Sequence, residues 1–426
     1  MDNVLIERVN DVYVRVSCEP GIKMELSGHF EFEVPGAKFI PSVRNKVWDG
    51  KIRLFNAMTG MIYAGLVPRI LKFCNMRDYP VEVSPGTYEI NDVPDDSGMQ
   101  LAKEFESTFV PREYQNEAVV HALKRDRALM LSPTASGKSF IIYMLTRFHM
   151  AQGRKTIIVV PTTSLVEQMA SDFIEYNNGN PLDIHKIRGG IDKNVDAEIT
   201  ITTWQSIYKL KKDWYEKFDV VVGDEAHLFK AKSLISVLEK MIDCKYRYGF
   251  TGTLDGSQTH KLVLEGLFGA VYEVTTTKKL IEDNTLAEFG ITAITLQYPD
   301  AVRKLNKGKT YQEEIDWIVT NESRNKYIRN LAHSLHGNTL ILFQFVEKHG
   351  KVLLPMLEKE GKHVHFIYGG ISAEDREEVR RLAETNDDNI ILASYGTFST
   401  GVNIKRLDNI ISVSYTHLTL PTIYSV

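Results

Sequence analysis

A loop suited to binding phosphate groups follows a short apolar run near position 130. The run RALMLS predicts a buried strand, and KSFIIYMLTRFHMAQG has the apolar spacing of a helix. The loop between them would point backbone N–H groups, reinforced by the helix dipole, at one place. There Lys138 would meet the β- and γ-phosphates of a nucleotide, and the Ser139 hydroxyl would bind Mg²⁺. The first glycine of G-x-x-x-x-G-K-[ST] is Ser132 here, so this loop taken alone also fits an ordinary strand–turn–helix.

A second element supplies carboxylates. The run FDVVVGDEAHLF places Asp224 and Glu225 directly after a near-continuous apolar strand. In open α/β sheets, ligands sit at this carboxyl end of the strands. Asp224 would hold Mg²⁺ through water and Glu225 would polarise the attacking water, although an isolated acidic pair could also simply begin a helix. Because both elements occur in this order, each at a strand end, the sequence predicts a site for a nucleoside triphosphate and Mg²⁺.

The size and composition of the chain are those of an ordinary globular protein. Its 426 residues suggest two or three domains, and no apolar stretch approaches the ~18 residues of a membrane span. The start MDNVLIERVND lacks the basic and apolar regions of a signal peptide, and three scattered cysteines fit a reducing compartment. We therefore expect a cytoplasmic protein. A net charge of −4 does not decide nucleic-acid binding, which depends on local basic tracks.

The order of predicted elements indicates an α/β protein in several parts. Residues 1–85 combine strand signals with one helix, which predicts a small α+β domain, and the acidic, turn-rich residues 86–103 indicate a linker. Residues 104–285 alternate strands and helices, as in a parallel sheet with crossover helices. A second α/β run covers 286–413, with predicted strands ITAITLQY, TLILFQF, HVHFIY and NIILAS.

A series of motifs in a fixed order extends the two candidate elements. They are PREYQNEAV, SPTASGKS, VVPTTSLVEQM, RGG, ITTWQS, GDEAH, GFTGTL, LILFQFV, YGGISAEDRE and ASYGTFSTGVNI. In this order they resemble the motifs of the superfamily 2 helicases. The resemblance implies two RecA-like parallel-sheet domains, the first of which binds ATP.

The resemblance also implies roles for individual residues. Nucleotide contacts are implied for Arg112 and Gln115 at the adenine, for Thr134, Ala135, Ser136, Gly137, Lys138 and Ser139 in the loop, and for Gly401 and Asn403 in the second domain. Contacts to one DNA strand are implied for Pro161, Thr162, Thr163, Gly189, Gly190 and Thr203, and in the second domain for Gly369, Gly370, Arg376 and Thr397. His227 would couple the γ-phosphate to Thr251 and Thr253, although a capping or core histidine is the alternative.

Three stretches carry a narrower resemblance. RNKVWDGKIRLF, KGKTYQEEI and ASYGTFSTGVNIKRL resemble the UvsW recombination helicases of T-even-type phages. That family implies ATP-driven work on branched or duplex DNA in recombination and repair: branch migration, fork regression and unwinding of R-loops, which contain an RNA–DNA hybrid. Single-strand-binding or recombination proteins are then the expected protein partners.

A basic stretch between positions 38 and 72 is interleaved with aromatic residues. Cations on phosphates and aromatic rings on bases are typical of nucleic-acid binding. The alternative is a solvated basic face with Trp48 in the core. With the family resemblance, we expect DNA contacts from Lys46, Trp48, Lys51 and Arg53.

The family's Q-x-x-G-R-x-x-R motif, which supplies arginines to the nucleotide, is absent. After LDNIISV the chain reads SYTHLTLPTIYSV, residues 414–426, which resemble translated adapter sequence and predict an incomplete second domain. Because arginine fingers contribute orders of magnitude in rate, we expect weak ATP binding and slow hydrolysis by this chain. A naturally truncated regulatory ATP-binding protein is the alternative.

Other functions share the same core motifs. A restriction-system motor would need a nuclease, but the amino-terminal part has no P-D…(D/E)-x-K signature. An RNA helicase and a nucleic-acid-binding protein with a degenerate ATPase also stay open.

Overall fold

The computed structural model describes residues 3–34, 36–228, 232–254, 258–287, 290–358, 362–370, 379, 381–382, 385–398 and 406–413. The chain groups into two compact units, residues 1–289 and 290–426. The finer boundaries expected within the first unit stay predictions, and the tail 414–426 lies outside the described residues. Among the helices that the structure describes, none has the length and apolar character needed to span a membrane.

The first unit begins with the α+β module that the sequence predicts. Its mixed sheet has the order β5-β2-β1-β6, built from β1 (Val4–Arg8), β2 (Tyr13–Ser17), β5 (Met61–Tyr63) and β6 (Val81–Val83). The strands share a core with α1 (Pro20–His29) and α3 (Val67–Met76). In β2 the alternation is direct, because Val14 and Val16 are buried while Arg15 is exposed.

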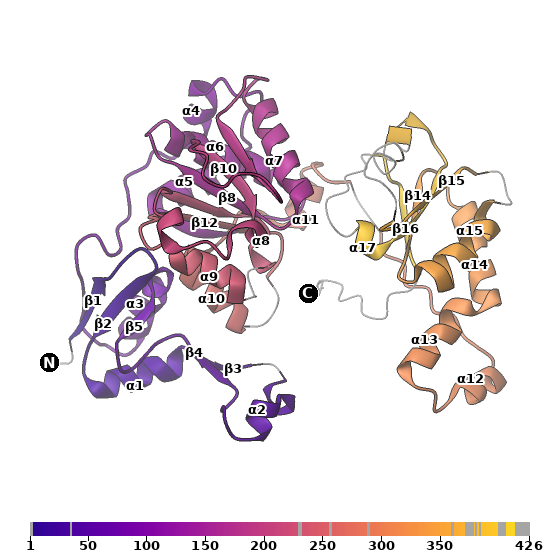
Figure 1. The fold of residues 1–426 in the computed structure, drawn as a ribbon, viewed down its shortest axis with the longest axis horizontal. Helices are drawn as coiled ribbons and strands as arrows, with labels where there is room; N and C mark the ends of the chain where they lie inside the picture. The colour runs from indigo at the N-terminus through magenta and orange to yellow at the C-terminus, as the bar shows by residue number, and fades with distance from the viewer. Residues whose placement is uncertain are drawn as a thin grey trace. The chain divides into compact units, whose positions relative to one another are not determined.

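An arm extends from this module away from its sheet (Figure 1). We call residues 31–53 the amino-terminal arm. It contains the antiparallel pair β3 (Glu31–Glu33) and β4 (Lys51–Arg53), with η1 (Ala37–Phe39) and α2 (Pro41–Arg44) between them. Only Ala37 is buried in the two helices, so the arm presents most of its side chains to solvent.

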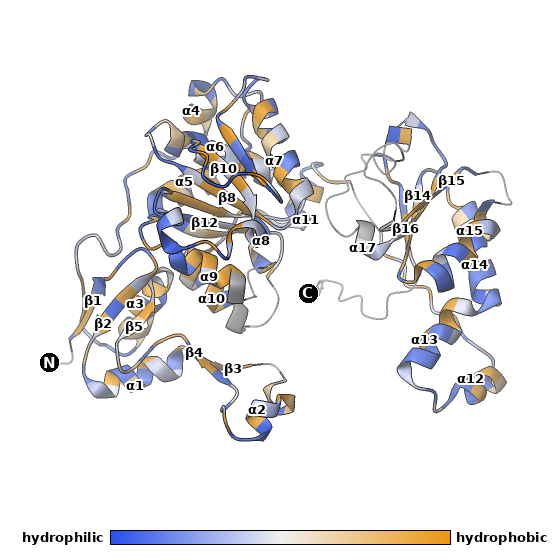
Figure 2. Cartoon of the chain, in the orientation of Figure 1, coloured by the Kyte–Doolittle hydropathy of each residue, from blue (hydrophilic) through white to orange (hydrophobic). Residues whose placement is uncertain are grey.

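A seven-stranded parallel sheet forms the body of the first unit, in the order β13-β7-β12-β11-β8-β10-β9. The strands are β7 (Arg127–Leu131), β8 (Thr156–Val160), β9 (Ile184–Ile187), β10 (Ile199–Thr203), β11 (Val220–Gly223), β12 (Tyr246–Thr251) and β13 (Val271–Glu273). Apolar residues run along β12 and its neighbours (Figure 2), as expected for strands covered on both faces.

Two hydrophobic cores cover this sheet. One contains side chains of α4 (Ser97–Glu104), α5 (Glu113–Arg125), α6 (Lys138–Met150) and α7 (Thr163–Tyr176). The other contains side chains of α8 (Trp204–Ile207), α9 (Lys232–Lys240) and α10 (Gln258–Phe268). A RecA-like domain with helices on both faces of a parallel sheet is therefore confirmed.

Polar contacts join the amino-terminal module to α9 and α10, two of the helices that cover the large sheet. The hydroxyls of Tyr13 and Tyr63 both donate to Glu239 Oε1, at 3.0 and 2.7 Å. Arg69 forms a bidentate ion pair with the buried carboxylate of Glu265. Because bidentate arginine–carboxylate pairs fix orientation as well as distance, the module and the sheet are held in one arrangement.

The second unit contains a smaller parallel sheet with the order β15-β16-β14-β17. Its strands are β14 (Thr339–Phe343), β15 (Val364–Ile367), β16 (Ile390–Ser394) and β17 (Asn409–Ser412), and α14 (Glu322–Ser334) and α15 (Lys351–Leu357) share its core. The strand predicted for ITAITLQY is wrong. Residues 291–298 form no strand, and Ile291 and Ile294 are exposed because no strand of the described sheet pairs with them.

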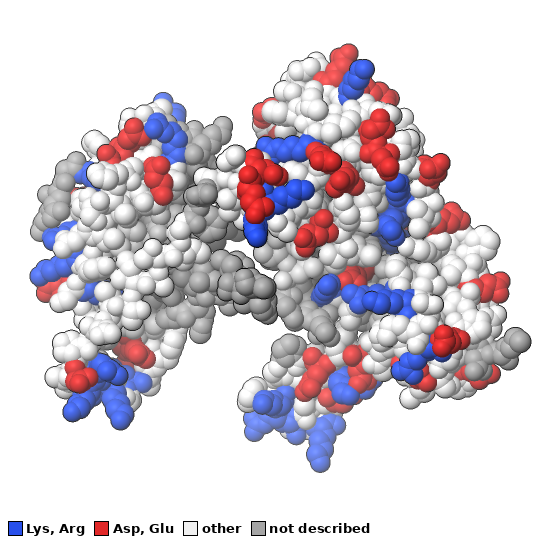
Figure 3. All heavy atoms as spheres, turned by 180° about the vertical axis from the view of Figure 1, so that it is seen from behind, with Lys and Arg blue, Asp and Glu red and all other residues white. Residues whose placement is uncertain are grey.

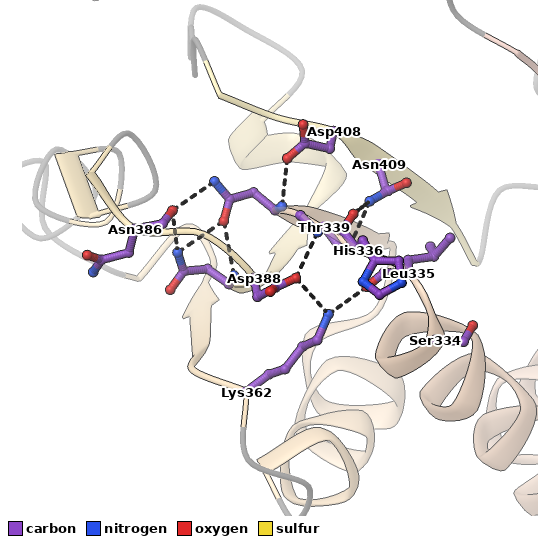
Figure 4. Close-up of polar contacts among 12 residues, drawn as sticks. Ser334, Leu335, His336, Thr339, Lys362, Asn386, Asp388, Asp408 and Asn409 are labelled. Carbon is purple, nitrogen blue, oxygen red and sulfur yellow. Dashed lines mark hydrogen bonds and ion pairs between the residues drawn. The ribbon is translucent and has the colours of Figure 1, made fainter.

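A polar cluster ties the amino ends of three strands of this sheet (Figure 4). Asn338 precedes β14, Asn389 precedes β16 and Asp408 precedes β17. The buried Asn338 amide donates to the carbonyls of Asn386 and Arg406 at 3.1 and 2.9 Å. Its oxygen accepts from the backbone and side-chain N–H groups of Asn389, and its backbone N–H donates to Asp408.

Replacing Asn338 with alanine is expected to destabilise the second unit locally by about 2–4 kcal/mol. Four side-chain hydrogen bonds disappear, and the buried backbone and side-chain N–H groups of Asn389 lose the Asn338 oxygen as acceptor. Hydrogen exchange of the β14 and β16 amides measures the loss. Asn330→Ala on the exposed side of α14 is the control and should change these amides by less than about 0.5 kcal/mol; equal protection in both variants would contradict the expectation.

Candidate functional site

The predicted site residues gather along one edge of the large sheet. All seven strands are parallel, so their carboxyl ends share an edge. β7, β12 and β11 are consecutive neighbours in the sheet. The predicted phosphate-binding loop follows β7, Thr251 ends β12 and is followed by Gly252, and Asp224 and Glu225 follow β11. β8, β10 and β9 form the other half of the sheet and are followed by the expected DNA contacts. The residues expected to contact a nucleotide and those expected to contact a DNA strand therefore lie on adjacent halves of the same edge.

The loop between β7 and α6 has the backbone conformation of an anion cradle. Ala135 and Gly137 adopt left-handed conformations, with φ of 64° and 75°. Such alternation turns successive N–H groups toward one concavity at the start of a helix. The backbone angle of Gly137 favours glycine, and a Cβ there would lie 2.2 Å from Gln115 Nε2 and displace that amide.

Ser132, the departure from the usual glycine, is accommodated as a buried hydroxyl. Its Oγ lies 2.6 Å from Ser136 Oγ, which in turn donates to Pro133 O at 2.6 Å. The backbone N–H of Ser132 donates to Thr251 O at the end of β12. These bonds close the loop on itself, so the serine supports the cradle internally.

Lys138, which follows the loop after β7, contacts the two carboxylates after β11, on the other side of β12. Its Nζ lies 2.9 Å from Asp224 Oδ1 and 2.5 Å from Glu225 Oε1. Asp224 is buried, whereas the Glu225 side chain is about one-third exposed. Glu225 takes a left-handed φ of 50°, which is uncommon for a residue other than glycine. The distances therefore show that Lys138, Asp224 and Glu225 converge, as the sequence predicts.

The electrostatics of this cluster are strongly coupled. Burial alone would raise the pKa of Glu225, but hydrogen bonding to His227 and the charge of Lys138 outweigh it and lower that pKa to about 2. Burial opposes the charge of Lys138, yet Asp224 and Glu225 together raise the pKa of its ammonium. The Glu225 carboxylate and the Lys138 ammonium are therefore charged together at neutral pH.

Ser139 has a different partner from the one expected. Its hydroxyl lies 2.9 Å from the hydroxyl of Tyr176 on α7. Tyr176 belongs to an aromatic cluster with Phe109, Phe140 and Tyr143. In this structure the Ser139 hydroxyl is thus held by an aromatic cluster, and its metal contact stays a prediction.

Gln115 also makes contacts within the protein. Its Oε1 accepts from Arg112 N and its Nε2 donates to Ser136 O, both at 2.9 Å. The Arg112 side chain donates to Tyr114, whose hydroxyl donates to the same carbonyl. These contacts connect the segment before α5 to the loop backbone. One N–H and one lone pair of the Gln115 amide are left for an adenine, so that role stays a prediction.

His227 connects the carboxylates to the end of β12. Its Nδ1 lies 2.9 Å from Thr251 Oγ1 and 3.3 Å from Glu225 Oε2. The Thr251 hydroxyl donates to Thr253 O at 2.7 Å. The expected grouping of His227 with both threonines is present, although Thr253 takes part through its backbone.

In the first unit, the residues expected to contact a DNA strand lie at or just after the carboxyl ends of β8, β9 and β10. Gly189 and Gly190 are exposed with open space around them, and Thr163 is exposed at the start of α7. The Thr162 hydroxyl caps α7 by accepting from Leu165 N, next to Pro161. Thr203 is buried, and its hydroxyl lies 3.0 Å from Ser206 Oγ. Its expected contact with a DNA strand therefore stays a prediction that this burial does not favour.

In the second unit the expected contacts follow adjacent strands. Gly369 and Gly370 are exposed after β15, and Thr397 lies in α17 (Tyr395–Phe398), directly after β16. Arg376, Gly401 and Asn403 lie outside the described residues. All of these assignments stay predictions.

In the amino-terminal arm, two of the cations expected to contact DNA are ion-paired, and their DNA contacts stay predictions. Lys51 pairs with Glu31, and Arg53 pairs with Glu31 and Asp49 at 2.7 and 2.6 Å. Trp48 donates its indole N–H to Lys51 O at 2.9 Å. These residues thus maintain the arm's own structure.

Other cations of the arm have no acidic partner among the described residues: Lys38, Arg44 and Lys46. Beside them Phe39 and Val47 are 74% and 81% exposed. The sequence contained Lys38, Arg44 and Phe39 in the same basic stretch, but only the ion pairs of Lys51 and Arg53 reveal which charges are uncompensated.

Comparisons with known proteins agree with this arrangement. The family models for "DNA helicase UvsW, N-terminal", "Type III restriction enzyme, res subunit" and "Helicase conserved C-terminal domain" match residues 6–84, 108–256 and 323–424. The ATP-dependent DNA helicase uvsW of Enterobacteria phage T4 is 35% identical over 94% of this chain and 82% of that protein. A DNA 3'-5' translocase XPB2 of Sulfurisphaera tokodaii is 30% identical over 33% of this chain and 30% of that protein.

Solved structures show the same relationship. The crystal structure of T4 UvsW covers 97% of this chain and 84% of its own, with a TM-score of 0.60 and 32% identity. S. cerevisiae Dbp5 bound to RNA and ADP BeF3 covers 77% of this chain and 80% of its own, with a TM-score of 0.50 and 15% identity, which shows a shared fold alone. On the sequence identity, the coverage and the converging Lys138, Asp224 and Glu225, the chain belongs to the UvsW family of superfamily 2 ATP-dependent DNA helicases.

Proposed function

We propose that this helicase acts on branched DNA, driving branch migration, fork regression and R-loop unwinding in recombination and repair. The observation that carries the proposal is the contact of Lys138 with both Asp224 and Glu225, on the same sheet edge as the exposed Gly189–Gly190 loop. A site that hydrolyses ATP beside a site that holds a strand is the minimum that a DNA motor needs. The T4 relative is named a DNA helicase, which supports DNA as the substrate.

ATP would bind with its phosphates in the concavity formed by the loop of Ala135 and Gly137. Lys138 would leave the carboxylates and approach the β- and γ-phosphates, because these carry more negative charge. Glu225 would then lose Lys138, one of the two residues that lower its pKa, so that burial would raise that pKa and make the carboxylate a better acceptor for a proton of the attacking water. Binding of the nucleotide would in this way prepare its own hydrolysis.

The same carboxylates suit Mg²⁺. A buried Asp224 and the neighbouring Glu225 already attract a cation, the Lys138 ammonium, and Mg²⁺ typically takes one or two carboxylates together with substrate phosphates. Asp224 would hold the ion through water, and Ser139 would have to rotate away from Tyr176 to contribute its hydroxyl. When bound, the ion neutralises charge that develops on the phosphates.

The amino-terminal arm would contact the branch. Uncompensated Lys38, Arg44 and Lys46 can bind phosphates, and the exposed Phe39 ring can stack on an unpaired base at the point where strands separate. Compensated Lys51 and Arg53 would hold the arm in shape.

The proposed substrate is tested by comparing nucleic acids as stimulants of ATP hydrolysis. Four-way junctions, forks and R-loops should stimulate turnover more than linear duplex DNA, and RNA duplexes should stimulate it least. Equal stimulation by RNA duplex and branched DNA would favour an RNA helicase. A lack of preference for branches over linear duplex would remove the branched-DNA part of the proposal.

The arm makes a separate prediction. A combined Arg44→Ala and Lys46→Ala variant should lose the preference for branched DNA. Its salt dependence of DNA binding, d log K/d log[salt], should be shallower by about 0.9 for each phosphate that the arm no longer neutralises. Lys103→Ala with Lys278→Ala removes two exposed lysines elsewhere in the first unit and is the matched control. An arm variant that keeps the branch preference of the unsubstituted chain would contradict the role of the arm.

A further inference from the structure

The second unit has its own arm, to which none of the expected site residues belongs. We call residues 300–320 the helical arm: α12 (Asp300–Asn306), a turn, and α13 (Tyr311–Thr320). α13 is anchored, because Ile315 and Val319 are buried. In contrast, α12 has no buried residue. The arm therefore has a fixed base and an end that faces solvent (Figure 1).

Further contacts keep the base in place. Asp316 of α13 pairs with Lys348 at 2.7 Å, and Trp317 packs edge-on against Tyr298, with ring centroids 4.8 Å apart. A capping box formed by Thr310 and Glu313 fixes the start of α13. Because the turn comes directly before this cap, the contacts of α13 fix the position of the turn on the second unit.

The end of α12 and the residues that follow it are strongly basic, and we call residues 303–309 the basic turn. Residues 303–309 read RKLNKGK, four cations and no acid in seven residues. Arg303 has an acidic partner, Asp300 at 3.3 Å, but both side chains are mostly exposed, so the pair contributes little. Among the described residues, neither Lys304 nor Lys307 has an acidic partner, and both are exposed. Lysine and arginine side chains gather over α12 in Figure 3.

The remaining cation, Lys309, forms no ion pair with an acid among the described residues. Its Nζ donates to the neutral side chain of Asn306 at 2.6 Å, and, after the hydrogen bonds of the capping box, its charge also helps to lower the pKa of Glu313 in α13. Gly308 turns the chain with φ of 93° and has open space where a Cβ would lie, so a ligand could approach the backbone between Lys307 and Lys309. Leu305 is 80% exposed among the cations. Like charges this close repel one another, and an anionic partner would relieve the repulsion.

We propose that the basic turn Arg303–Lys309 is a contact surface for the phosphodiester backbone of DNA. Lysines act as point charges and do not select bases, which suits a motor that must move along any sequence. The inference rests on the proposed function, since it takes DNA as the polymer on which the protein works. It adds a contact in the second unit that lies outside the loops after β15 and β16.

A charge-neutralising variant tests the surface. Lys304→Gln, Lys307→Gln and Lys309→Gln combined in the full chain remove three exposed charges from the turn. The matched control replaces Lys326, Arg329 and Lys351 with glutamine, which removes three charges from α14 and α15 of the same unit. Binding is measured by fluorescence anisotropy with a single strand and a duplex of equal length, over a series of salt concentrations.

The arm variant should bind at least one of the two DNAs about tenfold more weakly at low salt, with d log K/d log[salt] shallower by about 2–3 on duplex DNA. Loss on the duplex alone would assign the turn to double-stranded DNA, and loss on the single strand alone would assign it to the tracked strand. Its ATP hydrolysis without DNA should equal that of the unsubstituted chain, since no substituted residue lies in the first unit.

Three results would overturn the inference. Unchanged affinity and salt dependence in the arm variant, with normal DNA binding by the unsubstituted chain, would remove this surface and leave the proposed function intact. Equal weakening by the α14 and α15 control would show a general charge effect. Absence of DNA binding by the unsubstituted chain would instead refute the proposed function together with this surface.

Discussion

Replacing Glu225 with glutamine is expected to lower ATP hydrolysis at least about 100-fold while ATP binding is retained, because a positioned general base contributes about 10²–10⁴ in rate. Glutamine has nearly the same shape but cannot accept a proton from water. Asp224 stays 2.9 Å from Lys138, so the ammonium keeps a carboxylate partner and the loop should keep its conformation. Hydrolysis is measured in single turnovers with protein in excess, and binding with a fluorescent nucleotide analogue.

The control for this substitution is Glu216→Gln. Glu216 is half-exposed in the same unit and lies 3.9 Å from Lys212, so its loss should leave turnover unchanged within about twofold. Turnover by the Glu225→Gln variant at the rate of the unsubstituted chain would show that another group activates the water. Loss of binding and turnover together would instead mean that Glu225 acts by holding Lys138 and the loop in place.

The site was largely predictable where backbone topology alone brings residues together. Parallel strands must end at one edge, so a loop after β7 and carboxylates after β11 had to share that edge wherever the sheet formed. Gly137 was predictable as well, since a helix start with a left-handed residue favours glycine. The order of the strands was not readable, and it is this order that puts Thr251 between the loop and Asp224.

Side-chain partners could not be predicted in the same way. The Ser139 hydroxyl bonds to Tyr176, and Lys51 pairs with Glu31 across β3 and β4, although each lies well apart from its partner in the sequence. Motif patterns name residue types and do not report which neighbouring side chain each residue contacts. The wrong strand at residues 291–298 has a related cause, because alternating apolar residues form a strand only where another strand can pair with them.

A second large effect is expected on stability, from a residue outside the motifs. Arg247 of β12 is fully buried and donates to three carbonyls: Leu238 O, Met241 O and Leu267 O, at 2.9, 3.0 and 2.7 Å. Leu238 lies in the last turn of α9 and Leu267 in that of α10, whose final carbonyls have no partner within the helix. One guanidinium therefore caps two helices against the sheet, and its charge suits the negative ends of both helix dipoles.

Substituting methionine for Arg247 should destabilise the first unit by about 3–5 kcal/mol, because three buried carbonyls lose charge-assisted bonds and each such loss costs about 1–3 kcal/mol. Burial of the guanidinium, which also lowers its pKa, offsets part of this cost because the variant no longer has to desolvate a charge. Hydrogen exchange of the β12 and β7 amides reports the loss directly. Arg247→Lys should recover only part of it, since a single ammonium cannot reproduce the planar fork.

The neighbouring Lys245→Met is the matched control. Lys245 is half-exposed and pairs with Asp126 at 2.9 Å, so its removal should cost less than about 1 kcal/mol. Equal protection losses in the two methionine variants would mean that the three carbonyls find other donors, such as water, and that Arg247 does not cap the helices. A large loss of amide protection confined to Arg247→Met would instead show that the buried Arg247 charge stabilises β12. Thr251 ends this strand, so the site edge would then depend on a charge near the strand's start.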